Sequence, residues 1–135
     1  RSLVGSEMCI RGSYYSPRTE HGSSLSACMY ALLACRCGDA VSAYPFFLKS
    51  AKADWDGGGK QWAGLVYIGG THPAAAGGAW KVLAQGFAGL EVTEDGAKVN
   101  PCLPEEWERV SFRFCVKGKW YRAELTQEKG EITAL

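Results

Sequence analysis

Fifteen basic residues against fourteen acidic ones leave this chain of 135 residues a net charge of only +1. This balance argues against a nucleic-acid or membrane-surface partner, because both attract strongly basic proteins. The longest apolar stretch, near residues 27–34, is far too short to cross a bilayer. The length suffices for one domain with a core or for part of a larger protein. Because the chain lacks an initiating Met, we expect a fragment or one chain of a processed protein.

The chain up to about residue 89 carries helical signals. An apolar run from Leu25 to Cys37 predicts a helix, with Ser23 or Ser24 suited to cap its start. Gly38 follows the run and is suited to end the helix, because glycine readily adopts the left-handed conformation of a C-cap.

Asp39 opens a second helical segment in which apolar residues recur every three or four positions. This stripe, typical of a helix buried on one face, comprises Val41, Tyr44, Leu48, Ala51 and Trp55. Pro45 falls inside it, so we expect a kink or a late start. Residues 56–60 are a loop by composition.

The segment Gly69-Gly70-Thr71-His72-Pro73 leads into a third helix, which we expect to end near Gly86 or Gly89. Proline is tolerated in the first turn because its missing N–H would lack an intrahelical partner. The N–H groups of such a helix start, its positive dipole end and the His72 imidazole form a receptor for an anion. The alternative is a capped helix packed on a neighbour, with His72 hydrogen-bonded in the structure.

Two glycines, Gly77 and Gly78, fall within this third helix. Each lowers helix stability by about 1 kcal/mol. A close approach of another backbone or of a ligand is a physical reason for placing glycine at these positions.

After Leu90 the apolar period falls to two. Alternation over residues 110–116 predicts a half-buried strand, and residues 120–125 return as a second strand after a turn at residues 117–119. Residues 90–93 and 97–100 flank Glu94-Asp95-Gly96 and indicate another hairpin. Helices followed by strands predict an α+β chain with two structural units, not a wound α/β sheet.

The six cysteines do not form a metal-binding or disulfide pattern in the sequence. Cys28 and Cys35 sit seven residues apart in the helical run and are expected in the core. No second pair completes a zinc site with Cys35-Arg36-Cys37, so we expect no metal. Cys9, Cys102 and Cys115 are isolated. We therefore expect reduced cysteines and a cytoplasmic location.

Three stretches of the chain resemble glycoside hydrolase family 65. Residues 14–26, YYSPRTEHGSSLS, resemble its YxPRTxHxSSLS signature, and Gly70-Thr71-His72 resembles its GxH segment. Residues 86–90, 100–107 and 111–114 resemble its closing GFxGL…NPxLPxxW…LxFR region. The likeness keeps its order across about residues 14–126. The family includes maltose, trehalose, kojibiose and nigerose phosphorylases.

The resemblance implies an (α/α)6-barrel catalytic domain followed by a small jelly-roll β-sandwich. Residues 1–88 would be the last helices of that barrel, and residues 89–135 most of the β domain. The remainder of the catalytic domain would be the partner of this chain. Alone, the chain would expose a broad apolar face, and we expect it to be inactive and poorly soluble.

The implied chemistry is inverting phosphorolysis of an α-linked glucosyl disaccharide to β-glucose 1-phosphate, with inorganic phosphate as co-substrate and no other cofactor. The family's general acid, a glutamate, lies upstream of these motifs, and no glutamate of this chain is a credible replacement for it. A trehalose-type hydrolase of the same family is one alternative. A non-catalytic carbohydrate-binding or structural piece, with Trp107, Trp120 and Tyr121 as a sugar platform, is another.

By resemblance, the phosphate contacts would be Ser23, Ser24 and His72, with backbone N–H groups near Ala76 and Gly77 as weaker candidates. His21 matches the signature and would orient the serine segment or contact phosphate. Many family members have a serine after GxH, where this chain has only alanines at 74–76, so one hydroxyl ligand is missing. A homodimer is compatible with the family. The sequence leaves the identity of the disaccharide open.

Overall fold

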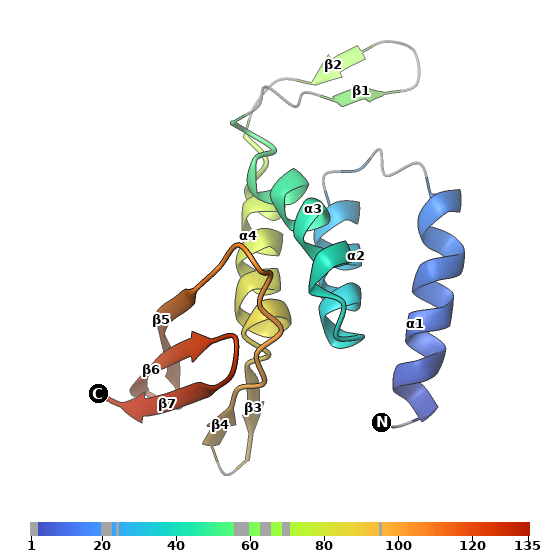
Figure 1. Cartoon of the computed structure of the whole chain (residues 1–135). Helices are drawn as coiled ribbons and strands as arrows, with labels where there is room; N and C mark the ends of the chain where they lie inside the picture. Colours follow the sequence, from blue (N-terminus) through green and yellow to red (C-terminus); the bar gives the residue numbers. More distant parts are fainter. Residues whose placement is uncertain are drawn as a thin grey trace.

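A computed structural model describes residues 3–19, 23, 25–55, 60–62, 66–68, 71–94 and 96–135. Helices dominate the first two thirds of the chain and antiparallel strands the last third, in agreement with the α+β prediction (Figure 1). The helices are α1 (Leu3–Tyr15), η1 (Ser16–Arg18), α2 (Ser26–Arg36), α3 (Ala40–Ala51), α4 (Pro73–Lys81) and the π-helix η2 (Val82–Phe87). The strands are β1 (Lys60–Trp62), β2 (Val66–Ile68), β3 (Glu91–Thr93), β4 (Gly96–Lys98), β5 (Arg109–Val116), β6 (Lys119–Thr126) and β7 (Gly130–Ala134).

The end of α2 and the start of α3 follow the sequence prediction. Gly38 has a positive φ of 77°, its N–H donates to Cys35 O, and the Asp39 N–H donates to Ala34 O. This is a Schellman cap, which satisfies two of the last carbonyls of α2. The Asp39 carboxylate then accepts the Ser42 N–H at 2.9 Å and starts α3. The predicted late start is wrong, because α3 begins at Ala40 and continues through position 45.

The predicted buried stripe of α3 is confirmed at Tyr44, which packs against the core, but is wrong at both of its ends. Val41 and Trp55 are 76% and 88% exposed, whereas Ala43 and Ser50 are buried and Phe47 packs against the core. Positions 43, 47 and 50 have the same helical spacing as the predicted stripe but lie on another face. A helix with apolar residues around most of its circumference offers several such stripes, and only tertiary packing selects one.

Helices α2 and α4 run parallel and in close contact. A Cβ at Gly78 of α4 would lie 2.5 Å from Cys28 Sγ, and a Cβ at Gly86 of η2 would lie 3.1 Å from Cys35 Sγ. Later residues of one helix thus meet later residues of the other, so both helices start at the same end of the helical layer (Figure 1). The close approach expected at the glycine pair is present at Gly78, whereas Gly77 has no neighbour within 4 Å.

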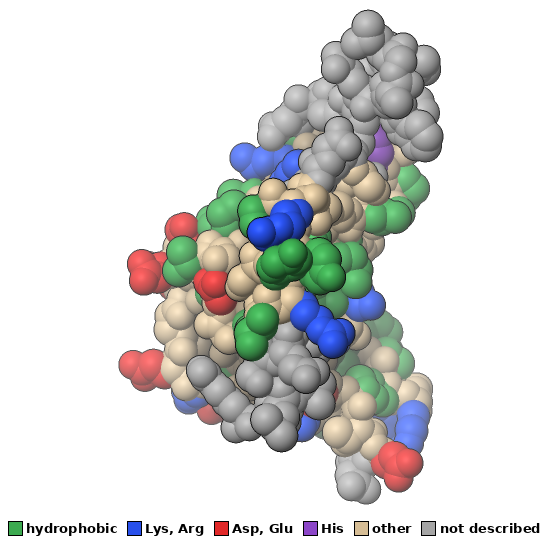
Figure 2. All heavy atoms as spheres, turned by 90° about the vertical axis from the view of Figure 1, so that its right-hand side faces the viewer, with side chains coloured by type: hydrophobic (Ala, Val, Ile, Leu, Met, Phe, Trp, Pro, Cys, Tyr) green, Lys and Arg blue, Asp and Glu red, His purple; other side chains and the backbone are tan. Residues whose placement is uncertain are grey.

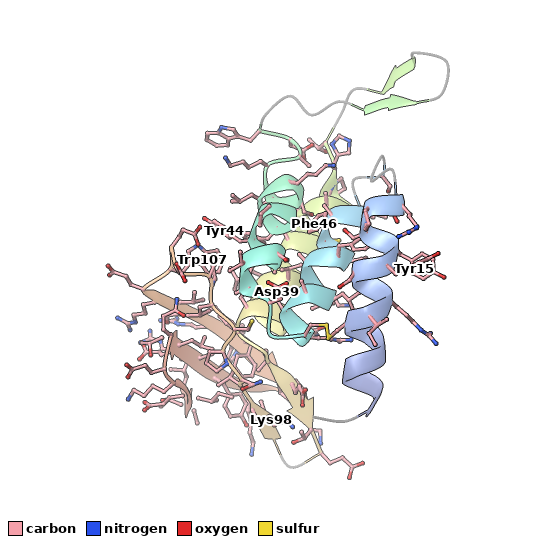
Figure 3. The ribbon with its side chains drawn as sticks, turned by 45° about the vertical axis from the view of Figure 1, so that its right-hand side comes forward. Tyr15, Asp39, Tyr44, Phe46, Lys98 and Trp107 are labelled. Atoms are coloured by element: carbon pink, nitrogen blue, oxygen red, sulfur yellow. A yellow bond between two sulfur atoms is a disulfide. The ribbon has the colours of Figure 1, made fainter. Side chains whose placement is uncertain are left out.

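One hydrophobic core joins the helices to the β-sheet. The Trp107 ring lies 5.0 Å from Phe87, 5.4 Å from Phe47 and 5.9 Å from Tyr44, centroid to centroid (Figure 3). On the other side of the core, Trp80 contacts Phe112 edge to face. Trp107 is thus partly buried and packs against the core, which argues against its role in a sugar platform, whereas Trp120 is 56% exposed.

The C-terminal strands form the two predicted hairpins, β3–β4 and β5–β6, and an additional pairing of β6 with β7. β5 and β6 pair in a register that places Phe112 opposite Ala123, both buried, across a tight turn with positive φ at Lys117 and Gly118. β3 pairs with β4. β7 extends the sheet to the order β5-β6-β7, and β1 pairs with β2; neither β7 nor the β1–β2 hairpin was predicted.

The barrel, the jelly roll and the boundary at residues 88–89 stay predictions. The described elements show a helical layer and small antiparallel sheets, without the closure that would define either architecture. Helix α1 bears exposed apolar side chains, including Ile10 (70% exposed), Tyr14 and Tyr15, and Figure 2 shows apolar side chains among basic ones on this side. In the described part of the chain, no helix is both long and apolar enough to span a membrane.

The cysteines depart from the expectation that all are reduced. Cys9 of α1 and Cys37 at the end of α2 form a disulfide, with their Cα atoms 5.7 Å apart (Figure 3). The two positions are 28 residues apart in the sequence, and only the packing of α1 against α2 brings them together. Of the remaining cysteines, Cys28 and Cys35 are buried, as predicted.

Candidate functional site

The predicted anion-binding residues gather at one end of the helical layer. Ser23 lies three positions before the first residue of α2, and His72 is the N-cap of α4, so the parallel packing of these helices brings both positions to the same end. The chain that leaves α3 reaches this end as well and supplies Asp54. Ser24 and His21 lie outside the described residues, and their predicted roles stay predictions.

His72 is held by Asp54 through its backbone and its side chain. The His72 N–H donates to both carboxylate oxygens of Asp54, at 2.9 and 2.8 Å, and His72 Nδ1 lies 2.5 Å from Asp54 Oδ1. A carboxylate only accepts hydrogen bonds, so Nδ1 carries the proton in this contact. The imidazole is thereby fixed, and among the residues that the structure describes Nε2 has no hydrogen-bond partner.

The Asp54 carboxylate titrates below its usual range. Donation from the His72 backbone N–H is the largest cause of the lowered pKa, followed by the hydrogen bond and the charge of the His72 side chain. The Asp54 side chain is 40% exposed and that of His72 is 21% exposed. The Asp54 carboxylate is thus ionised at neutral pH, and both side chains remain partly open to solvent.

The first turn of α4 is anchored from α3. Buried Ser50 donates from its hydroxyl to Ala75 O at 3.0 Å. The Ala75 and Ala76 N–H groups donate to His72 O at 2.9 and 3.1 Å. The Ala76 N–H is therefore engaged within the helix start, and a ligand would compete for it. Gly77 is exposed, but its N–H points along the helix axis, as in the regular hydrogen-bonding pattern of a helix, so a ligand would compete for it as well.

Ser23 stabilises the turn that leads into α2. Its Oγ accepts the Leu25 N–H at 3.3 Å, and its carbonyl accepts the Ser26 N–H at 3.1 Å. The residue is exposed, and its hydroxyl still has a proton to donate. The N-cap of α2 is Leu25, which makes no side-chain cap hydrogen bond, so the predicted capping by a serine is wrong. Ser23 supports the preceding turn instead, and its hydroxyl can still contact a ligand.

Asp54 is the site residue that the sequence did not reveal. It follows α3 by three positions, whereas its partner lies 18 residues further along the chain. Nothing in its local spacing marks it, because the contact depends on α3 running antiparallel to α4.

The glutamates that the structure describes lie in surface contexts. Glu91 pairs with Lys98, which lowers the pKa of the Glu91 carboxyl, opposite to the rise that an acid catalyst needs. Four further glutamates are exposed: Glu94, Glu105, Glu106 and Glu108. Glu20 and the Glu7 side chain lie outside the description. Among the described residues, no three acidic, histidine or cysteine side chains cluster as a metal site.

Comparison with known proteins matches both halves of the chain to one family. The model of the "Glycosyl hydrolase family 65 central catalytic domain" matches residues 5–81, and that of the "Glycosyl hydrolase family 65, C-terminal domain" matches residues 90–135.

Relatives with assigned activities agree with this match. A nigerose phosphorylase of Lachnoclostridium phytofermentans is 54% identical over 123 residues, and a kojibiose phosphorylase of Caldanaerobacter subterraneus is 38% identical over 128. These alignments cover 91% and 93% of this chain but only 16% of each relative. A solved structure, described as a candidate kojibiose phosphorylase from human microbiome, shares the fold with a TM-score of 0.79 at 23% identity, over 97% of this chain and 19% of its own.

Proposed function

Because the chain belongs to glycoside hydrolase family 65, we propose that it forms part of an enzyme that cleaves an α-linked glucosyl disaccharide with inorganic phosphate. The reaction inverts the anomeric centre and releases β-glucose 1-phosphate and a free sugar. Relatives that match most of this chain are phosphorylases of such α-glucosides. Since the chain spans 16% of the relatives' length, the activity is that of the whole protein.

Within that enzyme, this chain would supply the phosphate site. An inverting hydrolase needs a second carboxylate to activate water, whereas phosphate is already an anionic nucleophile and needs a cradle. We assign the cradle to Ser23, Ser24 and His72, with weaker contacts from the backbone near Ala76 and Gly77 and support from His21. Hydroxyl and imidazole donors at helix starts suit a phosphate oxygen.

One observation carries this proposal. The starts of α2 and α4 lie at the same end of the helical layer, and the imidazole of His72 is fixed there with one ring nitrogen left for a ligand. Two positive helix ends that converge on one region attract an anion more strongly than either alone.

The test uses the protein made from the complete reading frame. Nigerose would be offered first, because the nigerose phosphorylase has the higher identity of the two relatives compared above, and then kojibiose, trehalose and maltose. Phosphate would be varied from zero to saturation, and β-glucose 1-phosphate would be measured. We expect cleavage only with phosphate.

Cleavage that is indifferent to phosphate would instead assign a hydrolase, and Ser23 and His72 would then be scaffold. Sugar binding by residues 89–135 without any turnover would favour the carbohydrate-binding alternative, although Trp107 packs against the core. A cytoplasmic location and a homodimer complete the proposal. A persistent Cys9–Cys37 disulfide in the purified protein would argue against the location, because cytosolic disulfides are rare.

A further inference from the structure

We propose that Asp54 is a positioning residue for the phosphate site, acting through His72 to hold the imidazole with its Nδ1 proton inward and Nε2 toward the anion. This inference rests on the proposed function. Asp54 itself would not contact phosphate, because two anions repel each other.

The contact geometry separates this role from ordinary helix capping. A capping carboxylate needs only the backbone N–H, and both Asp54 oxygens already accept that of His72 at 2.9 and 2.8 Å. The additional 2.5 Å contact between Asp54 Oδ1 and His72 Nδ1 joins the carboxylate to the ring. This second contact fixes the ring orientation and the tautomer, which a helix cap alone leaves open.

With Nδ1 bound to Asp54, the ring can contact a phosphate oxygen only through Nε2, and a hydrogen bond with that charged group is a charge-assisted one. Direct repulsion between Asp54 and phosphate opposes this gain. Because Asp54 is 40% exposed and the ring stands between the two anions, water screens that repulsion and orientation dominates.

The test is Asp54→Asn in the full-length protein. Asparagine retains a side-chain oxygen that can accept the His72 N–H, so this contact to the start of α4 is preserved. The negative charge against Nδ1 is lost. We expect the KM for phosphate to rise about tenfold, the size of one hydrogen bond to a charged group, and the KM for the disaccharide to change by less than about twofold.

Asp39→Asn is the matched control. Asp39 is the N-cap of α3 and its carboxylate likewise accepts a backbone N–H, that of Ser42 at 2.9 Å, but it lies at the other end of the layer. Its replacement removes the same charge from a helix start and should leave the phosphate KM unchanged. Melting temperatures of both variants would show that neither effect comes from unfolding.

A double-mutant cycle shows whether Asp54 acts through His72. In a His72→Gln background, Asp54→Asn should have no further effect on the phosphate KM, because the ring it positions is gone. An unchanged phosphate KM in Asp54→Asn, or a full additional effect in the His72→Gln background, would overturn the inference while leaving phosphorolysis intact. Phosphate-independent cleavage by the unsubstituted protein would overturn the proposed function and, with it, this role for Asp54.

Discussion

Two adjacent glycines of α4 should respond to the same substitution with opposite sign. Gly77 faces open space, so Gly77→Ala adds a methyl group without contact and gains helix propensity, about 1 kcal/mol of stability. Gly78→Ala makes the same local gain but places its methyl 2.5 Å from Cys28 Sγ and 2.9 Å from Cys28 Cβ. Overpacking of this kind costs about 1–3 kcal/mol.

Cys28 has little room to yield. It is 4% exposed, and its thiol donates to Leu25 O at 3.0 Å, so the side chain cannot turn away without losing that bond. The Cβ contact does not depend on the rotamer at all. We therefore expect Gly78→Ala to lose about 1 kcal/mol net, which separates the two variants by about 2 kcal/mol.

The assay compares urea-unfolding midpoints of the two full-length variants under identical conditions. Adding Cys28→Ala to Gly78→Ala removes the sulfur and should recover part of the loss, whereas it should only weaken the Gly77→Ala variant. If Gly78→Ala proved as stable as Gly77→Ala, the close parallel packing of α2 and α4, and with it the shared end of their helix starts, would be refuted.

Three further outcomes follow from the structure. The Cys35 thiol donates to Cys102 and lowers the pKa of Cys102 to about 7, so alkylation of Cys102 by iodoacetamide should rise through pH 7, and Cys35→Ala should move that rise toward the ordinary 9.0. The lowered pKa of Asp54 means that its stabilisation is present above the usual 3.8 and lost as pH falls further, so unfolding midpoints of the unsubstituted protein and Asp54→Asn should converge there. Gly89→Ala should lower the melting temperature strongly, because Gly89 has a φ of 59° and a Cβ would lie 2.1 Å from Asn100 O; an unchanged value would contradict this geometry.

The sequence predicted the parts of the fold that depend on the conformational preferences and hydrogen bonds of a few neighbouring residues. Gly38 and Asp39 mark the junction between α2 and α3, Pro73 marks the start of α4, and Lys117-Gly118 marks a hairpin turn. In each case the conformation is set by a residue's own backbone preference or by a side chain that bonds a neighbouring N–H. Such signals act over a few residues, and the structure confirms them.

The features that were missed depend on contacts between distant segments. The buried face of α3 is selected by what packs on it, so Ala43 and Ser50 were not separable from Val41 by spacing alone. The Cys9–Cys37 disulfide requires α1 to lie beside α2. β7 was missed because its five residues depend on pairing with β6 more than on their own pattern.

The candidate site shows both kinds of information meeting at one residue. Local signals predicted that His72 begins a helix, and a helix start alone attracts anions only weakly. What makes the position specific is the long-range arrangement: α2 packs parallel to α4, so two helix starts converge, and the chain leaving α3 brings a carboxylate to the ring. A histidine whose Nδ1 is bound to a carboxylate can offer only Nε2 to a ligand. The packing of α3 against α4 orients the imidazole in this way, and because that packing joins distant segments, the sequence alone did not predict the role of Asp54.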